Sequence, residues 1–78
     1  MSDQEERLSS IVGIISKVGE IGAVAPDQDF YDAGFASVNS LPLLMELEDR
    51  FGVTIPDDRY INARTPRELS DLLSSLQQ

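Results

Sequence analysis

Apolar residues recur at helical spacing near the amino end of the chain. They share one face of a helix predicted from about residue 3 to about residue 18, and they are Leu8, Ile11, Val12, Ile15 and Val18. Ser2 followed by Glu5 is typical of a capping box, in which each side chain bonds to the other residue's backbone amide. Gly13 inside this helix costs about 1 kcal/mol relative to alanine, so the helix depends on tertiary packing.

The helical spacing stops at Gly19, Gly22 and Pro26, and residues 19–36 are predicted to form a loop. An irregular segment of this length is uncommon in a small domain and is often functional. We expect three aromatic residues to anchor the loop in the core, because aromatic side chains bury large areas. They are Phe30, Tyr31 and Phe35.

A second apolar stretch predicts a helix over about residues 37–51, ended by Gly52. Its apolar residues cover two faces. One stripe fits a core and consists of Leu43, Leu47 and Phe51. The other either completes a two-sided core or faces a partner or ligand, and consists of Val38, Leu41 and Met45. Pro42 lacks a backbone donor, so it either distorts the first turns or delays the regular helix until about Ser40.

The carboxyl-terminal part of the chain predicts a connector over 53–56, a short helix over 57–62 and a longer helix after Thr65. Threonine at the N-cap, proline at the next position and glutamate two positions further on form a strong helix start. The leucines that follow repeat at helical spacing: Leu69, Leu72, Leu73 and Leu76. The chain is thus predicted to be one all-α domain over 1–78, an antiparallel bundle of three longer helices and one short helix.

The composition excludes several classes of function. The 78 residues include neither cysteine nor histidine, which removes disulfides, thiolate metal sites and the side chain that most often acts as a base near neutral pH. The net charge of −8 disfavours binding to nucleic acid or to an anionic membrane surface. No apolar run is long enough for a membrane span, and we expect a cytoplasmic protein with basic partners.

The negative charge is concentrated in the middle of the chain. Residues 20–58 contain nine acidic residues and one basic residue, whereas the acidic and basic residues elsewhere balance. This distribution either indicates where a basic partner docks or simply keeps a small domain in solution. The acidic stretch 27–32 does not fit a calcium-binding EF-hand, because Tyr31 occupies a ligand position and Val38 stands where the bidentate glutamate belongs.

The spacing around one serine is more specific. Gly34 lies three residues before Ser37, Phe51 lies 14 residues after that serine, and Ile55-Pro56-Asp57 follows at 18 to 20 residues. This order resembles the acyl carrier protein family, whose pattern is an acidic loop, Leu-Gly-x-Asp-Ser-Leu, a helix and then Phe-x-x-x-Ile-Pro-Asp. The resemblance extends over essentially the whole chain, including the Thr-Pro start of the last helix.

The resemblance implies that Ser37 carries a 4′-phosphopantetheine arm taken from coenzyme A, on which cargo is held as a thioester. The arm would supply the thiol that a chain without cysteine lacks. A phosphodiester at this position would face free backbone N–H groups and the positive end of the helix dipole. The other interpretation of Ser37 is a simple helix N-cap.

The sequence departs from the family pattern next to this serine. Ala36 replaces the aspartate before it, Val38 replaces the leucine after it, and Asn39 and Pro42 stand where acidic residues are common. These departures indicate a divergent transferase or a dedicated loading enzyme. In these departures the chain resembles specialised stand-alone carriers, including those loaded with amino acids. Fatty acyl, polyketide and amino acid groups remain alternatives for the cargo.

A second serine is the alternative attachment site. Asn39-Ser40-Leu41 mimics the family's Asp-Ser-Leu, but the distances from Ser40 to Gly34, Phe51 and Pro56 each differ from the family pattern by three residues.

The resemblance also implies docking residues and partners. By position, Val38, Leu41 and Met45 match the family's partner-facing apolar residues, and Glu48 and Asp49 match its acidic contacts. We expect Asp57 and Asp58 to help attract basic surfaces. The implied partners are a phosphopantetheinyl transferase and loading ligase or synthase enzymes with basic docking patches, and the implied state is a monomer without catalytic activity.

An unmodified acidic helical module that binds a partner through the same apolar stripe is the competing hypothesis. It would account for the clustered charge, but it gives no reason for the spacing of glycine, serine and phenylalanine.

Overall fold

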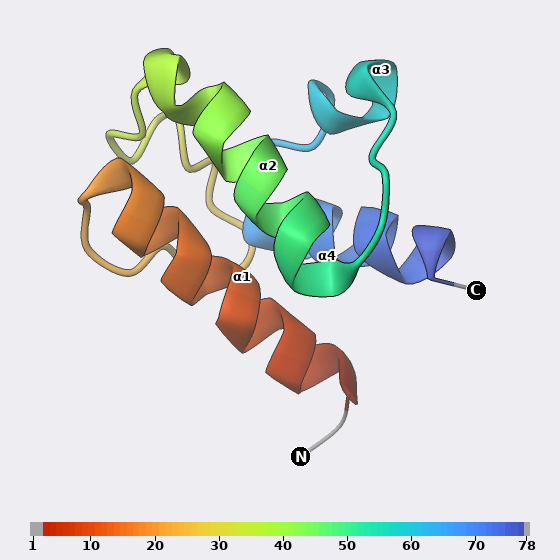
Figure 1. Ribbon diagram of the computed structural model, residues 1–78. Helices are drawn as coiled ribbons and strands as arrows, with labels where there is room; N and C mark the ends of the chain where they lie inside the picture. Colours follow the sequence, from red (N-terminus) through yellow and green to blue (C-terminus); the bar gives the residue numbers. More distant parts are fainter. Residues whose placement is uncertain (1–2, 78) are drawn as a thin grey trace.

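The computed structural model describes residues 3–77 and contains only helices and irregular segments within that range. The helices are α1 (Asp3–Gly19), a 3-10 turn η1 (Ser37–Asn39), α2 (Ser40–Phe51), α3 (Asp57–Tyr60) and α4 (Pro66–Leu76). Figure 1 shows α1 and α2 running in opposite directions, with α4 crossing behind them and the short α3 at one end. The predicted all-α antiparallel bundle with one short helix is confirmed.

The core lies where α1, α2 and α4 meet the loop after α1. Its fully buried members include Ile11, Ile15, Phe30, Leu43, Leu47, Leu69 and Leu73. The predicted stripe of α1 supplies two of these residues, whereas Ile14 is buried although the prediction omitted it. The reason is that α1 contacts both α2 and α4, so more than one stripe of its surface is covered.

The end of α1 is shaped by a close contact with the loop. Gly19 is the last helical residue, and Glu20 after it adopts the left-handed conformation with a φ of 53°. A Cβ atom on Gly19 would lie 2.5 Å from Cδ1 of Phe35, so the absence of a side chain lets this ring approach the helix. Ser2, predicted to form a capping box with Glu5, lies outside the described residues.

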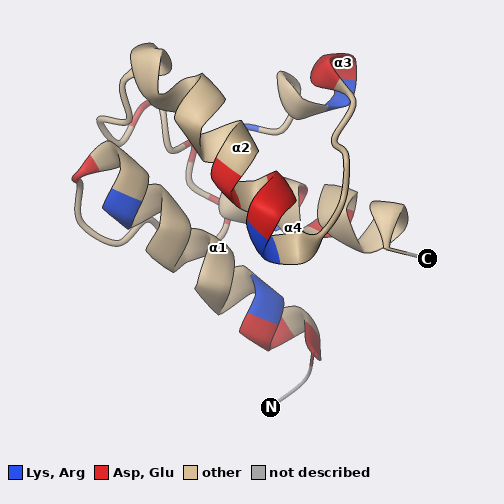
Figure 2. Cartoon of the chain, in the orientation of Figure 1, with Lys and Arg blue, Asp and Glu red and all other residues tan. Residues whose placement is uncertain are grey.

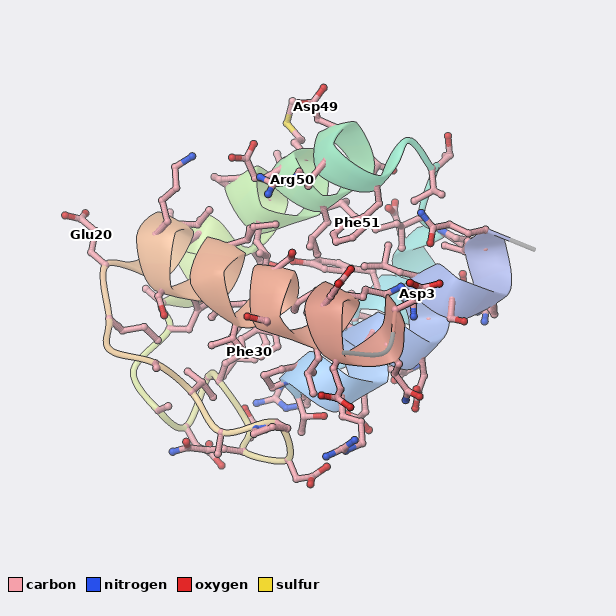
Figure 3. The ribbon with its side chains drawn as sticks, turned by 90° about the horizontal axis from the view of Figure 1, so that it is seen from below. Asp3, Glu20, Phe30, Asp49, Arg50 and Phe51 are labelled. Atoms are coloured by element: carbon pink, nitrogen blue, oxygen red, sulfur yellow. The ribbon has the colours of Figure 1, made fainter. Side chains whose placement is uncertain are left out.

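The loop between α1 and η1 is anchored by the three aromatic residues that were predicted to hold it. Phe30 and Phe35 are buried and pack edge to face with ring centroids 5.3 Å apart, while Tyr31 is half-buried against both rings. In Figure 3, Phe30 lies below α1 and points into the molecule. The backbone N–H of Phe30 also donates a hydrogen bond to the carbonyl oxygen of Arg64 at 3.0 Å.

The start of α2 is delayed, as one of the two interpretations of Pro42 predicted. Residues 37–39 form the 3-10 turn, and the α-helix begins only at Ser40. Pro42 is then the third residue of α2, where a backbone donor has no intrahelical acceptor in any case. The helix ends as predicted at Gly52, which has a φ of 66° and donates its N–H to the carbonyl oxygen of Glu48 at 2.9 Å.

The last two helices follow the prediction with one change. α3 ends at Tyr60 and residues 61–62 form a turn, so this helix is shorter than the predicted 57–62. The start of α4 is the predicted capping box: the Glu68 amide donates to Oγ1 of Thr65, and the Thr65 amide donates to Oε1 of Glu68, both at 3.1 Å. Among residues 3–77, none of the helices is both long enough and apolar enough to cross a bilayer.

Candidate functional site

Ser37 is the first residue of η1, and its side chain is exposed. The N-cap of this turn is Ala36, and Asn39 is the N-cap of α2, without a capping bond from its side chain. The backbone carbonyl of Ser37 accepts the N–H of Ser40. Its hydroxyl, however, makes no hydrogen bond with any of the described residues. The interpretation of Ser37 as a simple helix N-cap therefore finds no counterpart in the geometry.

Ser40, the alternative site, is held between two tyrosines. The Tyr31 hydroxyl donates to Oγ of Ser40 at 3.2 Å, and this Oγ lies 3.5 Å from the hydroxyl of Tyr60. The Tyr60 hydroxyl in turn donates to the carbonyl oxygen of Ser40 at 2.7 Å. Burial raises the pKa of Tyr60 to about 12, although the hydrogen bond from Ser40 opposes the shift. These contacts connect the loop, the start of α2 and α3.

An open groove of about 600 Å³ lies beside Ser37. It is lined by two hydroxyls, two aromatic rings, an aliphatic side chain and a guanidinium group, from Ser37, Ser40, Tyr31, Phe35, Ile61 and Arg64. The groove therefore combines an apolar wall with a small number of hydrogen-bonding groups, which is the composition typical of sites for small organic ligands. Neither Ile61 nor Arg64 stood out in the sequence, because both come from the turns around α3 and reach the groove only through the fold.

The apolar stripe predicted to face a partner is exposed. The exposed fraction is 80% for Val38, 62% for Leu41 and 61% for Met45, whereas Leu43 and Leu47 of the other stripe are fully buried. The interpretation as a two-sided core is therefore wrong, because nothing in the described chain covers this side of α2. Large apolar side chains left exposed together mark interaction surfaces.

Six of the nine acidic residues of the middle segment fall into two groups. Asp27 and Asp29 form ion pairs with Arg67 and Arg64, each at 2.7 Å, and Glu46 pairs with Lys17 at 3.1 Å. The other group projects from the end of α2 and from α3, the red segments of Figure 2, and includes Asp49, Asp57 and Asp58. In Figure 3, Asp49 points away from the body of the molecule.

Glu48, another predicted partner contact, has a structural contact as well. One of its carboxylate oxygens accepts the backbone N–H of Ile55 at 2.8 Å, which holds the connector between α2 and α3 against the helix. The side chain is half-buried. No spacing in the sequence indicated this contact.

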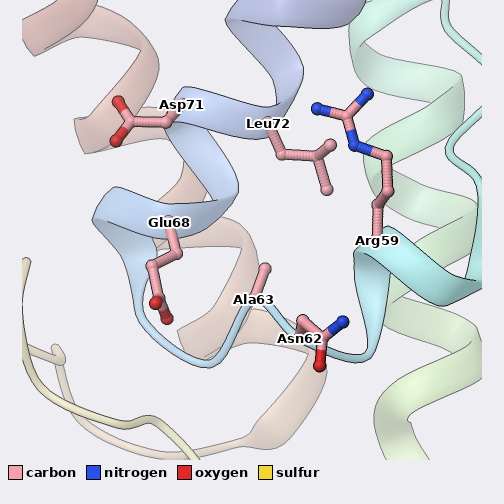
Figure 4. Close-up of a pocket in the computed structure, with 6 residues that line it drawn as sticks. All are labelled: Arg59, Asn62, Ala63, Glu68, Asp71 and Leu72. Atoms are coloured by element: carbon pink, nitrogen blue, oxygen red, sulfur yellow. The ribbon is translucent and has the colours of Figure 1, made fainter.

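A second, smaller depression lies between α3 and α4. It measures about 360 Å³ and is lined by Arg59, Asn62, Ala63, Glu68, Asp71 and Leu72. Figure 4 shows Arg59 and the two carboxylates on different sides of this depression. None of the predicted site residues borders it. Among residues 3–77, no three acidic side chains come close enough to hold a metal ion together.

An all-helical bundle with an exposed serine at the entry to its second helix has the organisation of a carrier domain. The chain belongs to the family described as "Phosphopantetheine attachment site", whose model matches residues 6–73. The prediction of an acyl carrier protein from the spacing around Ser37 is thereby confirmed. Carriers of this type hold acyl groups on a 4′-phosphopantetheine arm, which supplies the thiol for a thioester.

Individual relatives agree with this assignment. The chain is 44% identical over 48 residues to the actinorhodin polyketide synthase acyl carrier protein of Streptomyces coelicolor, covering 62% of this chain and 56% of the relative. It is 28% identical over 80 residues to the acyl carrier protein of Micrococcus luteus, covering 99% of each. With acyl carrier protein 2 of spinach chloroplasts, the alignment spans only 55% of the relative.

A solved structure supports the fold. The solution structure of the acetyl actinorhodin acyl carrier protein from Streptomyces coelicolor superposes with a TM-score of 0.61 at 31% identity. The superposition covers 97% of this chain and 88% of that one.

Proposed function

We propose that this protein is an acyl carrier without catalytic activity of its own and that its 4′-phosphopantetheine arm is attached to the hydroxyl of Ser37. The observation that supports this site is the contrast between two serines. Ser37 presents an exposed hydroxyl that is unbonded within residues 3–77, whereas the Ser40 hydroxyl is engaged by Tyr31 and Tyr60. A transferase reaches the first hydroxyl directly, but it would have to break the tyrosine contacts to reach the second.

The charge at the start of the second helix also favours this site. Neither η1 nor the first turn of α2 contains an acidic residue, since Ala36, Asn39 and Pro42 occupy positions where acids are common in the family. The positive end of the helix dipole is thus without a negative side chain of its own. A phosphodiester on Ser37 would place a negative charge there, so the departures from the family pattern are compatible with attachment.

The proposed docking surface consists of residues on η1, α2 and α3. Val38, Leu41 and Met45 supply its apolar centre, and Asp49, Asp57 and Asp58 supply charge that attracts basic enzymes. Glu48 belongs to the same surface, although one of its oxygens is used by Ile55. The expected partners are a phosphopantetheinyl transferase and synthase or ligase enzymes with basic patches, acting on a cytoplasmic monomer.

We also propose that the cargo is an acyl chain of the polyketide type. The support is the 44% identity to a polyketide synthase carrier over 48 residues and the 31% identity to the solved structure of the same kind. Fatty acyl and aminoacyl cargoes are the alternatives. Mass spectrometry of the protein isolated from its own host separates the three, because the mass of the ejected arm reports the group that it carries.

Attachment is tested by incubating the protein with coenzyme A and a phosphopantetheinyl transferase and measuring the intact mass. We expect the wild-type protein and the Ser40→Ala variant each to gain one arm and the Ser37→Ala variant to stay unmodified. Since Ala36 alters the usual recognition pattern, a transferase from the source organism should be among those used.

Two results would contradict the proposal. Modification of Ser37→Ala together with loss of modification in Ser40→Ala would move the site to Ser40. Protein from the native host without any arm would instead support the unmodified interaction module.

A further inference from the structure

We infer that Arg64 makes the groove beside Ser37 selective for acyl chains that carry a keto oxygen on the β-carbon, over unsubstituted alkyl chains of the same length. The inference rests on the carrier function proposed above and goes beyond it, because it names the residue that discriminates between cargoes. Three features support it: the position in which the guanidinium group is held, the N–H donors that it keeps for a ligand, and the other side chains that line the groove.

The guanidinium group is held by two contacts. Nε of Arg64 donates to Oδ2 of Asp29 at 2.7 Å, and Cζ lies 4.7 Å from the centroid of the Tyr31 ring. Asp29 is itself positioned, because its other oxygen accepts the backbone N–H groups of Tyr31 and Asp32 at 2.8 and 3.2 Å. The hydrogen bond from Arg64 lowers the pKa of Asp29, which favours the ionised carboxylate that pairs with the guanidinium group. A side chain held at two points loses little further entropy when it binds a ligand.

The same guanidinium group keeps donors for a ligand. An arginine has five N–H donors in a planar arrangement, and the ion pair with Asp29 uses the one on Nε. No hydrogen bond joins the terminal nitrogens of Arg64 to any residue in the range 3–77. Half of the side chain remains exposed, and Arg64 lines the groove together with Ser37.

The other side chains that line the groove carry no charge. Arg64 is the only charged residue among those that line it, and the remaining wall is supplied by Tyr31, Phe35, Ile61 and two serines. A chain with a β-keto oxygen would give the guanidinium an acceptor while its carbon atoms contact the rings and Ile61. An alkyl chain would cover the same donors without replacing the water bonded to them, which is unfavourable. The volume of about 600 Å³ is within the range of small-ligand sites.

The test uses the full-length carrier loaded in one step with octanoyl or β-keto-octanoyl arms from the corresponding coenzyme A thioesters. The rate at which β-mercaptoethanol, a neutral thiol, removes the acyl group reports how far the groove shields the thioester. We expect Arg64→Met to raise this rate about fivefold for the β-keto-octanoyl protein, the change typical of losing one hydrogen bond. The same substitution should not raise the octanoyl rate, because methionine removes the donors whose burial disfavours an alkyl chain. Each rate is compared with that of the wild-type protein carrying the same cargo, so intrinsic differences in thioester reactivity cancel.

The chain contains a matched control. Arg67 forms an equivalent ion pair with Asp27, at 2.7 and 3.3 Å, but does not line the groove. Arg67→Met should leave both rates unchanged. A measurement without substitution gives a second test: the Nε–Hε NMR signal of Arg64 should shift between the holo and β-keto-octanoyl forms and stay in place between the holo and octanoyl forms.

Equal effects of Arg64→Met on both cargoes, or no effect on either, would overturn the inference, as would an Nε–Hε signal that does not distinguish the cargoes. These results differ from a failure of the proposed function, in which the protein would not acquire an arm on Ser37 at all.

Discussion

Two regions of this small bundle use the same kinds of residues in opposite ways. In the loop before η1, Phe30 and Phe35 are buried, Asp27 bonds to Arg67 in the first turn of α4, and Asp29 bonds to Arg64 just before that helix. On η1 and α2, the large apolar side chains of Val38, Leu41 and Met45 are exposed, and the carboxylates of Asp49 on α2 and Asp57 on α3 face solvent. The aromatic and acidic side chains of the loop thus make contacts within the molecule. The exposed apolar side chains and solvent-facing carboxylates of η1, α2 and α3 remain available to a partner.

The difference matters for the electrostatics of docking. Hydrogen bonds from Arg67 and Arg64 lower the pKa of Asp27 and Asp29, and these paired charges are largely compensated within the molecule. An approaching partner would therefore be attracted mainly by the carboxylates without an arginine or lysine partner, which account for most of the net charge of −8. The sequence placed nine acids between residues 20 and 58, but only some of them are available to a partner.

Replacing the buried anchor of the loop should produce the largest effect on stability. Phe30 is fully buried between two other rings, so Phe30→Ala should cost about 3–5 kcal/mol. A domain of this size has roughly 4–12 kcal/mol in total, so the variant should lose a large part of its stability and unfold at a much lower urea concentration. Leu41→Ala on the exposed stripe should change stability by less than about 0.5 kcal/mol. Urea unfolding of both variants tests the contrast, and similar losses would mean that the α2 stripe is not free.

A second test compares two glycines of α1. Gly19→Ala should cost about 1–3 kcal/mol, because the new Cβ would meet the Phe35 ring and loosen the loop. Gly13→Ala should instead stabilise the protein by about 0.5–1 kcal/mol, since the helix gains a better helix former and the Cβ has no neighbour within 4 Å among the described residues. Thermal unfolding followed by circular dichroism measures both. Effects of the same sign would argue against the close packing of Phe35 on Gly19.

The contacts around Ser40 give a prediction with a pH dependence. Tyr60→Phe removes the hydrogen bond to the Ser40 carbonyl and should cost about 1 kcal/mol near neutral pH. In the wild-type protein, the raised pKa of Tyr60 favours the neutral folded form, so its contribution is complete below pH 10 and is lost as the pH rises toward about 12. The stability difference between the two proteins should therefore shrink across this range. Urea unfolding at pH 8 and pH 11 tests it, and a constant difference would show that the Tyr60 hydroxyl is not buried.

The smallest expected effect concerns docking. Asp49→Asn should lower kcat/KM for phosphopantetheinyl transfer about twofold at low salt, since an exposed charge at the edge of an interface mainly affects association. Asp27→Asn changes the net charge equally but lies in the loop and pairs with Arg67, so we expect no change in kcat/KM. The difference should vanish at roughly 1 M salt, where the screening length is about 3 Å. Equal effects of the two variants would indicate that net charge, rather than its position, attracts the enzyme.

Much of the fold could be predicted because its signals are local. The capping box of Thr65 and Glu68 and the apolar spacing of the three longer helices need only neighbouring residues to be recognised. The start of α2 at Ser40 could be predicted only as one of two alternatives. Pro42 cannot donate a backbone hydrogen bond, but this alone does not determine the conformation of the preceding residues. The burial of Ile14 was missed, because it depends on how many neighbours α1 has.

The candidate site was predictable to a similar extent. The spacing of Gly34, Ser37 and Phe51 indicated the family, which the family match confirms, and it is the basis for proposing Ser37 as the attachment site. The groove was not predictable, since Ile61 and Arg64 reach it from a distant turn. The hydrogen bond between Glu48 and Ile55 could not be predicted for the same reason. Nothing in the sequence around a carboxylate on a helix surface indicates which backbone amide it will contact.

Residue type and short-range spacing are enough to predict the helices, the excess of apolar residues on the second helix and the lack of any side chain able to hold a thioester. Packing of the folded chain establishes which apolar stripe is covered, which carboxylates are neutralised by arginines and which of the two serine hydroxyls is unbonded within residues 3–77. These outcomes depend on contacts between residues as far apart as Asp29 and Arg64, and such contacts exist only once the chain has packed.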